Sequence, residues 1–479
     1  MKINWVSPLP PARTDIAHYT ARVLPALCVH AKVTLWTDQK EWDKELEKFA
    51  RVRRFHGADI NWTEFNRADI TFYHIGNNPL FHGDIWRLSQ RAPGVIVLHD
   101  IRLHHFFDGL YREQNHDRAG YFALMERYYG AESLPDAQLC YDSDARNINE
   151  MAELYPLTPL ACAGALGALT HTREAFQLLQ KDAKQPLAYA PLPFATPPTL
   201  NKKRANTPPY RLIVFGYLGR NRRLREILQA LAGLPEKSRF RLDIYGEVTD
   251  NAELMADISR LKLRSFAAIH GFVPEAELDA ALHNAHLAFN LRYPTMGEAS
   301  GSQLRIWAHG LPAIVTQVGW YAALDAETVA FVRPEREVED IQAHLRDFLA
   351  APERFAAMGA RGRQILETAH APEIYAASVL EIAAQAKAWR GKTWAYELTE
   401  RAAALTAPWQ IAETSAGLAK LVSETALLAG WRKPGDREIY GEVSALSQTS
   451  RALAKPPAPT WRDKLQDKLD EWLLGARHE

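Results

Sequence analysis

The sequence predicts an α/β protein with two doubly wound domains followed by a helical extension. Short apolar runs alternate with longer amphipathic stretches up to about residue 375, which is typical of βαβ units around a parallel sheet. A proline-rich polar stretch interrupts the alternation midway, and strands are hard to find after residue 375. We therefore expect domains at 1–193 and 210–375, a linker at 194–209 and a helical region at 376–479.

Five apolar runs in the first half are expected to be strands: Lys2–Val6, Lys32–Trp36, Asp69–Ile75, Gly94–Leu98 and Leu166–Thr170. Ile16–Leu27 and Ile85–Arg91 are expected to be helices between them. Five more strands are expected after the linker: Arg211–Phe215, Arg241–Tyr245, Leu287–Leu291, Ala313–Thr316 and Val329–Val332. Leu224–Leu231 and Glu275–Asn284 are expected to be helices of this second half.

The composition fits a globular protein in a reducing compartment. Of its 479 residues 47% are hydrophobic and 24% are charged, so wholesale disorder is excluded. Lys+Arg and Asp+Glu both total 57, and this neutral balance argues against a nucleic-acid partner. The three cysteines, Cys28, Cys140 and Cys162, include no close pair, which excludes a disulfide scaffold and a CxxC site.

The sequence predicts a cytoplasmic protein. Three prolines between residues 8 and 11 leave no room for the apolar core of a signal peptide. No apolar run approaches the roughly 18 residues that a membrane span requires. The amphipathic segment Trp461–Leu474 is either a helix packed on its own domain or one that binds a partner or a membrane surface. Its polar face mixes acids with bases, which weakens the membrane interpretation, although peripheral contact through the C-terminal helices stays open.

Ligands of open α/β sheets bind beyond the carboxyl ends of the strands, so the turns there are candidate sites. The turn after the first strand has three prolines, and Thr14 or Asp15 is expected to cap the following helix. Backbone N–H groups at that helix start could meet an anion. A plain capped loop is the alternative.

The turn after the first strand of the second half combines glycines with arginines. Gly216 and Gly219 allow a sharp turn, and Arg220, Arg222 and Arg223 crowd the start of a helix. Three cations are unfavourable at a helix N-terminus unless an anion lies among them. Arginine matches phosphate oxygens in a bidentate manner, so we expect phosphate binding here rather than a solvated basic loop.

A third turn, at 292–303, joins a carboxylate to small and hydroxylated residues at a helix start. Ser300, Gly301 and Ser302 offer N–H groups and hydroxyls that suit a pyrophosphate. Glu298 could accept hydrogen bonds from sugar hydroxyls. An N-cap for the helix through Ile306 is the alternative, and one serine can do both.

The fourth candidate is rich in histidine. His74 lies near the end of one expected strand, Asn77 and His82 follow that strand, and His99 and Asp100 end the next one. A metal site is conceivable, but no HExxH or similar spacing is present. We therefore expect these residues to serve polar recognition or charge stabilisation.

These four turns together resemble the GT-B glycosyltransferases of the retaining family GT4, over about residues 1–384. The segment 297–320 is similar to the family's donor-site block "EGFG…EAMAxGxPVVAT…GG". The loop 216–223 is similar to its "GRLxxxKG" phosphate loop, and Pro10–Tyr19 is similar to its N-terminal "GGIxxYxxxL" loop. The resemblance implies two facing Rossmann-like domains.

It also implies an enzyme of class EC 2.4 that moves a sugar from a nucleotide-sugar donor to a glycan, lipid-linked or other acceptor, as in polysaccharide biosynthesis. No metal or cofactor is expected, since neither candidate donor loop contains a DxD run. Implied catalytic residues are Glu298 and His99. Implied donor and diphosphate ligands are Gly216, Arg220, Arg222, Arg223, Ser300, Gly301 and Ser302. Implied acceptor-side residues are Thr14, Asp15, Asn77 and Asp100.

The sequence departs from the family pattern at three positions. Arg305 replaces the second glutamate of the EX7E pattern, Glu298 is one place out of register with the first, and Asp15 stands at a glycine position. Two alternatives therefore stay open. One is a GT-B-like nucleotide-sugar epimerase, and the other is a catalytically silent nucleotide-sugar-binding or assembly protein.

Overall fold

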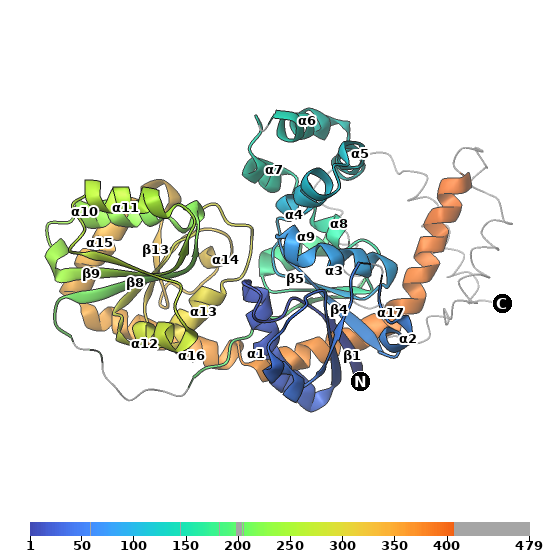
Figure 1. Ribbon diagram of the computed structural model, residues 1–479, viewed down its shortest axis with the longest axis horizontal. Coiled ribbons are helices and arrows are strands. Elements are labelled where there is room, and N and C mark those ends of the chain that lie inside the picture. Colours follow the sequence, from blue (N-terminus) through green and yellow to red (C-terminus); the bar gives the residue numbers. More distant parts are fainter. Residues whose placement is uncertain (58, 144, 182, 198–203, 205, 407–479) are drawn as a thin grey trace, which may run out of the picture. The chain divides into compact units, whose positions relative to one another are not determined.

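The computed structural model describes residues 1–406 except 58, 144, 182, 198–203 and 205 (Figure 1). The chain divides into two compact units, Met1–Gln385 and Ala386–Glu479. The first unit holds two parallel sheets, and a long helix, α17 (Pro372–Thr406), runs from the first unit into the second. The predicted amphipathic segment Trp461–Leu474 lies outside the described residues, as do residues 198–203 and 205 of the predicted linker.

The first sheet has seven parallel strands in the order β3-β2-β1-β4-β5-β6-β7. Their bounds are β1 Lys2–Val6, β2 Lys32–Thr37, β3 Arg51–Arg54, β4 Ile70–Ile75, β5 Val95–Leu98, β6 Gly167–Thr170 and β7 Leu187–Tyr189. The five predicted strands are present, and β3 and β7 were not predicted. Both lie at edges of the sheet, where a strand needs less apolar sequence.

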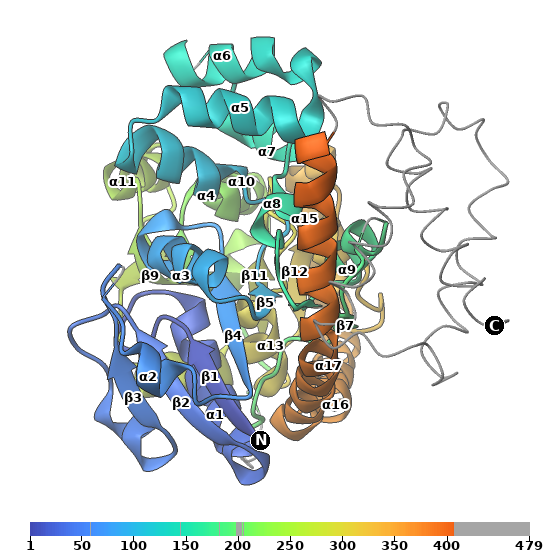
Figure 2. The same cartoon turned by 90° about the vertical axis from the view of Figure 1, so that its right-hand side faces the viewer.

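Helices α1 (Asp15–His30), α3 (Pro79–Arg91) and α9 (Arg173–Gln180) connect strands of the first sheet. The structure also contains a helical insertion between β5 and β6 that was not predicted. Its helices are α4 His104–Asp108, η2 Gly109–Gln114, α5 Arg118–Tyr129, η3 Ala131–Ser133, α6 Leu134–Ser143, α7 Ile148–Leu154 and α8 Thr158–Ala161. Figures 1 and 2 show α5, α6 and α7 grouped beyond the sheet. Their apolar side chains belong to the same buried core as those on one face of the sheet.

The second sheet has six parallel strands in the order β10-β9-β8-β11-β12-β13. Their bounds are β8 Tyr210–Leu218, β9 Phe240–Val248, β10 Ala267–Gly271, β11 Leu287–Asn290, β12 Ala313–Thr316 and β13 Ala330–Val332. Only β10, an edge strand with a weakly apolar sequence, was not predicted. Strands β8 and β9 run further than predicted, and their extended parts pair at Gly216 and Gly246. Both glycines have a positive φ (111° and 112°), and a Cβ on Gly246 would collide with the backbone of Gly216.

Helices cover both faces of the second sheet (Figure 1). One face carries α10 (Leu224–Ala232), α11 (Asn251–Arg260) and α15 (Glu337–Ala350). The other carries α12 (Glu275–Asn284), α13 (Gly301–Ala308) and α16 (Pro352–Ala369). The α/β class with two doubly wound sheets is therefore confirmed.

The chain crosses twice between the parts built on the two sheets. The N–H of Phe194 donates to the carbonyl of His370 at 2.8 Å, and the His370 ring donates to the carbonyl of Leu192 at 2.7 Å. After this pair, Tyr375 of α17 is buried against Tyr19 of α1 and bonds to its hydroxyl. The start of α17 thus returns to the first sheet. Among the described residues, no helix has the length and hydropathy that a membrane span needs.

Candidate functional site

A buried guanidinium lies at the carboxyl ends of the strands of the second sheet. Arg222, at the end of the 3-10 turn η4 (Arg220–Arg222), is only 3% exposed. Its Nη1 donates to Asn290 Oδ1 at 3.1 Å, and its Nη2 donates to the carbonyl of Phe215 at 3.1 Å. No carboxylate of the described residues forms an ion pair with it. A buried cation without a counter-ion is costly, so this position favours an anion.

Burial, followed by the charge of Arg292, lowers the pKa of Arg222 to about 10. The guanidinium is therefore still protonated at neutral pH. Its Nη2 also donates to Ser302 Oγ at 3.4 Å, which places the positive charge beside the first turn of α13.

The N-terminus of α13 faces the same space. Ser300 caps the helix, since its hydroxyl accepts from the N–H of Gln303 at 3.1 Å. Asn290 Nδ2 donates to Ser300 Oγ at 3.2 Å and to Gln303 Oε1 at 3.0 Å. Gln303 Nε2 is buried and has no partner within the described part of the chain. The free N–H groups of a first helical turn attract an anion, as Arg222 does.

Gly216 keeps this space open. A Cβ on Gly216 would lie 3.4 Å from Arg222 Nη2 and 3.9 Å from Ser302 Oγ, and its φ of 111° excludes most other residues. We call the space bordered by Gly216, Arg222, Gly301 and Ser302 the anion site.

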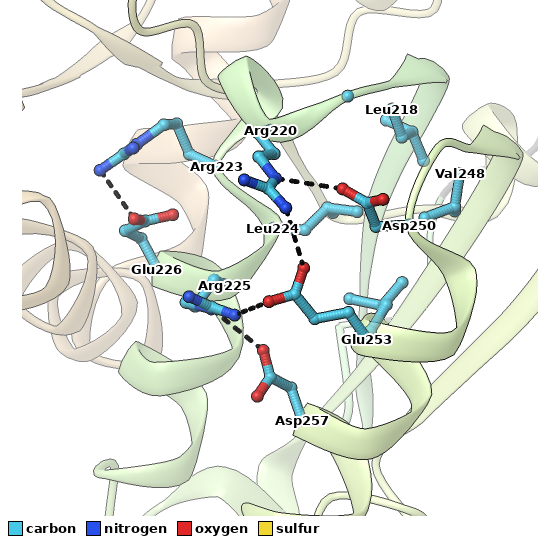
Figure 3. Close-up of a pocket in the computed structure, with 12 residues that line it drawn as sticks. Leu218, Arg220, Arg223, Leu224, Arg225, Glu226, Val248, Asp250, Glu253 and Asp257 are labelled. Atoms are coloured by element: carbon cyan, nitrogen blue, oxygen red, sulfur yellow. Dashed lines mark hydrogen bonds and ion pairs between the residues drawn. The ribbon is translucent and has the colours of Figure 1, made fainter. Parts of the chain in front are cut away.

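The prediction that Arg220 faces a phosphate is not supported by its surroundings. Arg220 is 84% exposed, and its Nε lies 3.1 Å from Asp250 Oδ2. Its Nη2 is 3.7 Å from Glu253. Figure 3 shows both carboxylates reaching toward it from α11 and the preceding turn. The pocket there, of about 220 Å³, has three arginines and the four carboxylates of Glu226, Asp250, Glu253 and Asp257, so it offers no surplus positive charge.

Arg223 is likewise neutralised by carboxylates. It has a left-handed backbone (φ 58°), and its Nη2 lies 2.7 Å from Glu226. Its Nε lies 2.6 Å from Glu337 of α15. In this structure the three arginines do not converge: Arg222 contacts Ser302, whereas Arg220 and Arg223 are paired with carboxylates.

Glu298 stabilises its own loop between β11 and α13. Its Oε2 accepts from Thr295 Oγ1 at 2.9 Å and from the N–H of Met296 at 2.8 Å. Its Oε1 lies 3.1 Å from Arg292 Nε. Burial lowers the pKa of Arg292, but the charge of Glu298, followed by Tyr321, raises it above its ordinary value. The carboxylate thus fixes the loop geometry, and its contact with a sugar stays a prediction.

The predicted His74 and His99 lie at the carboxyl ends of β4 and β5, beside His171 after β6, which was not predicted. His74 Nδ1 and His99 Nε2 share a hydrogen bond of 3.0 Å. The rings of Tyr19 and His171 lie 4.8 Å and 4.9 Å from the ring of His99. Burial, followed by the charges of His171 and His74, lowers the pKa of His99 well below its ordinary value, so the ring is neutral. Within the described residues, no group of three or more His, Cys, Asp or Glu is arranged to hold a metal.

Asp100 lies beside this cluster. Its Oδ2 accepts from the N–H of Asn77 at 2.7 Å. Burial, followed by the charge of Glu298, raises the pKa of Asp100 to about 7. Asn77 Oδ1 accepts from the N–H of Phe106 at 3.1 Å, so Asn77 also anchors the start of α4. The predicted pair Asn77 and Asp100 is thus in contact.

The loops that carry Asp100 and Glu298 touch. The N–H groups of Ile101 and Arg102 both donate to the carbonyl of Met296 at 3.0 Å. Gly297 has φ of 78°, and a Cβ there would lie 1.7 Å from Ile101 Cγ2, so only glycine fits.

Thr14 caps α1 as predicted, since its hydroxyl accepts from the N–H of Ile16 at 3.4 Å. Asp15 follows in the first turn, and its Oδ2 lies 4.0 Å from the position that a Cβ would take on Gly301. The contact places Asp15 at the border of the anion site.

Sequence inspection missed Asn290, Gln303 and the role of Arg305. Asn290 could have been found from the sequence, because it is a polar residue at the end of an apolar strand. Arg305 forms ion pairs with Asp279 at 2.7 Å and with Glu275 at 3.0 Å, both on α12.

Comparisons with known proteins bear on the fold and on the second half of the chain. A family model described as Glycosyl transferases group 1 matches residues 197–365. Sucrose-phosphate synthase from Thermosynechococcus elongatus is similar in structure, with a TM-score of 0.56 and 14% identity over 80% of this chain and 98% of that one. HepE from Anabaena in complex with UDP and glucose has a TM-score of 0.53 and 14% identity, with coverage of 80% and 98%.

A third similar structure is WaaG, a glycosyltransferase involved in lipopolysaccharide biosynthesis. It has a TM-score of 0.50 and 14% identity over 78% of this chain and 98% of that one. No curated protein matches the chain in sequence. At such low identities the structural likeness shows a shared fold, and this fold is GT-B, as the resemblance implied.

Proposed function

We propose that this protein, a glycosyltransferase whose residues 197–365 form a domain of glycosyl transferases group 1 (the GT4 family), transfers its sugar with retention of the anomeric configuration. The donor is a nucleotide sugar, and the acceptor that we propose is a glycan or a lipid-linked saccharide. The diphosphate of the donor binds in the anion site, and the acceptor binds on the side of the first sheet.

The buried guanidinium of Arg222, which lacks a carboxylate partner among the described residues, carries this proposal. In the reaction the bond between the anomeric carbon and the diphosphate oxygen breaks, and the diphosphate keeps the electron pair. Negative charge grows on that oxygen as the bond breaks. A fixed cation and the N-terminus of α13 stabilise this charge without reorganising, which lowers the barrier.

The neutral state of His99 suits the other half of the transition state. The sugar gains positive charge as the diphosphate leaves, and a protonated histidine beside it would raise the barrier. Burial, the main cause, keeps the pKa of His99 low, so the ring can donate or accept a hydrogen bond without repelling the sugar. Asp100, one residue further on, lies where an acceptor hydroxyl could be oriented.

A thermal-shift panel of nucleotide sugars on the full chain tests donor binding. UDP-glucose comes first, because the Anabaena HepE structures contain UDP and UDP-glucose. We expect one nucleoside diphosphate and its sugar to stabilise the protein, and the R222A variant to lose the shift. Absence of any shift across the panel would contradict the proposal.

Product analysis tests the reaction itself. With donor and a lipopolysaccharide or glycolipid acceptor, we expect release of the nucleoside diphosphate and a product whose anomeric configuration matches the donor by NMR. Donor incubated alone should remain unchanged. Isomerisation of the donor without acceptor would instead indicate an epimerase.

A further inference from the structure

We propose that Asp15 is an internal competitor for the anion site, so that its carboxylate sets how tightly a diphosphate binds. The inference rests on the proposed function, because it assumes that the anion site takes the donor's diphosphate. Asp15 belongs to α1, which connects strands of the first sheet, whereas the anion site is formed by residues next to the second sheet.

The position of Asp15 supports this role. Its Oδ2 lies 4.0 Å from the position that a Cβ would occupy on Gly301, the first residue of α13. Asp15 is exposed, and within the described part of the chain no group hydrogen-bonds to its carboxylate. A free negative charge therefore faces the same helix N-terminus that a phosphate would use.

The electrostatic interactions of Asp15 also support this role. Burial dominates the pKa of Arg222, and Asp15 is among the charges that raise it. Asp15 likewise raises the pKa values of the buried Arg292 and Asp100, although other causes are larger there. The carboxylate thus interacts with groups on both sides of the anion site and supplies part of the counter-charge that Arg222 otherwise lacks.

A bound diphosphate would bring a second anion to the same cation and the same helix. Two negative charges this close repel each other, and the repulsion weakens as salt screens it. Binding therefore requires the Asp15 side chain to turn away or to tolerate the repulsion. An asparagine keeps the size of the side chain and removes its charge.

Calorimetric titration of the full chain with UDP and with inorganic pyrophosphate tests the proposal. We expect D15N to lower the Kd for both anions about tenfold at low ionic strength, and salt to reduce this gain. E41Q removes one exposed negative charge elsewhere and should leave the Kd unchanged. R222A should weaken binding in either background.

The outcomes separate this inference from the proposed function. An unchanged or higher Kd for D15N, with R222A still weakening binding, would overturn the competitor role alone. A lower melting temperature without a change in Kd would show that Asp15 only stabilises the start of α1, and would also overturn it. Failure of both wild type and D15N to bind either anion would overturn both proposals.

Discussion

The guanidinium of Arg222 donates a hydrogen bond of 3.4 Å to the hydroxyl of Ser302, and this contact joins η4 to the first turn of α13 across 80 residues of sequence. Asn290 accepts from Arg222 through its Oδ1 and donates through its Nδ2 to Ser300, the cap of α13. The anion site is therefore held by a polar network with β11 at its centre. Removing any member leaves buried polar groups without partners.

Replacement of Arg222 by alanine should lower kcat/KM by about two to three orders of magnitude, in line with the loss of one preorganised charge-stabilising group. The matched control is R220A, because Arg220 is exposed and paired with Asp250 and Glu253. We expect R220A to stay within about threefold of wild type. Steady-state kinetics with varied donor, together with circular dichroism of both variants, measures the difference. Equal losses in both variants would contradict the assignment of Arg222.

E298Q should lower both turnover and stability. Its amide keeps the shape of the carboxylate but loses the charge that pairs with Arg292, and it exchanges an acceptor oxygen for a donor. We expect kcat/KM to fall at least tenfold and the free energy of unfolding to fall by about 1–3 kcal/mol, the range for a polar network left unsatisfied. E226Q, which removes one carboxylate partner of Arg223, is the control and should leave turnover unchanged. Denaturant unfolding and kinetics on both variants test this, and full activity of E298Q would exclude a role for the loop in transfer.

The sequence allowed prediction of the features that depend on one short segment, but not of those that depend on contacts between distant segments. Strand β4 is buried at all six positions, so its apolar run was recognisable, whereas β3, with three arginines in four residues, was not. The arginines of the phosphate loop were likewise recognisable in the sequence, but most of their partners were not. Of the carboxylates that neutralise Arg220 and Arg223, Glu226 is close in the sequence, whereas no local pattern connects Asp250, Glu253 and Glu337 to the loop.

The burial that makes Arg222 distinctive is likewise a property of the assembled sheet. Phe215, Asn290 and Ser302 meet around it from three separate segments. The predicted boundaries of the two domains stay predictions, because residues 1–385 form one compact unit that holds both sheets.

Asp100 should make stability depend on pH in an unusual direction. Burial, followed by the charge of Glu298, raises its pKa to about 7, above the value near 3.9 of an unfolded chain. The folded protein therefore binds the proton more strongly, and stability falls as the pH rises from about 4 through 7. D100N removes the free-energy cost of ionising a buried carboxyl group. We therefore expect its melting temperature to exceed that of wild type at pH 8 and to match it near pH 4. A gain of equal size at both pH values would contradict the raised pKa.

Removal of divalent cations should leave transfer intact. In the proposed binding mode, the positive charge that faces the diphosphate comes from Arg222 and from the N-terminus of α13, which are covalent parts of the chain. We expect kcat/KM to change less than twofold after dialysis against EDTA. Re-addition of Mg²⁺ or Mn²⁺ is the control for inhibition by the chelator itself. A loss of activity that either cation restores would show that the site needs a metal.

The buried histidines should make the fold sensitive to mild acid. Burial lowers the pKa values of His82 and His171 to about 4, although a backbone hydrogen bond opposes this at each ring. An unfolded chain protonates these rings near pH 6.5, so unfolding takes up protons below that pH. Their contribution to stability is complete above about pH 6.5 and is lost as the pH falls toward 4.

At pH 4 the loss should be about 3 kcal/mol for each ring, since one pKa unit corresponds to 1.36 kcal/mol. H171N replaces the ring with a side chain that can still donate to the carbonyl of Ala190, and we expect its stability to depend less steeply on pH between 6.5 and 4. H116N, at an exposed position, is the control and should keep the wild-type slope. Urea unfolding at several pH values measures both slopes, and an identical slope for H171N would mean that His171 is not held neutral by burial.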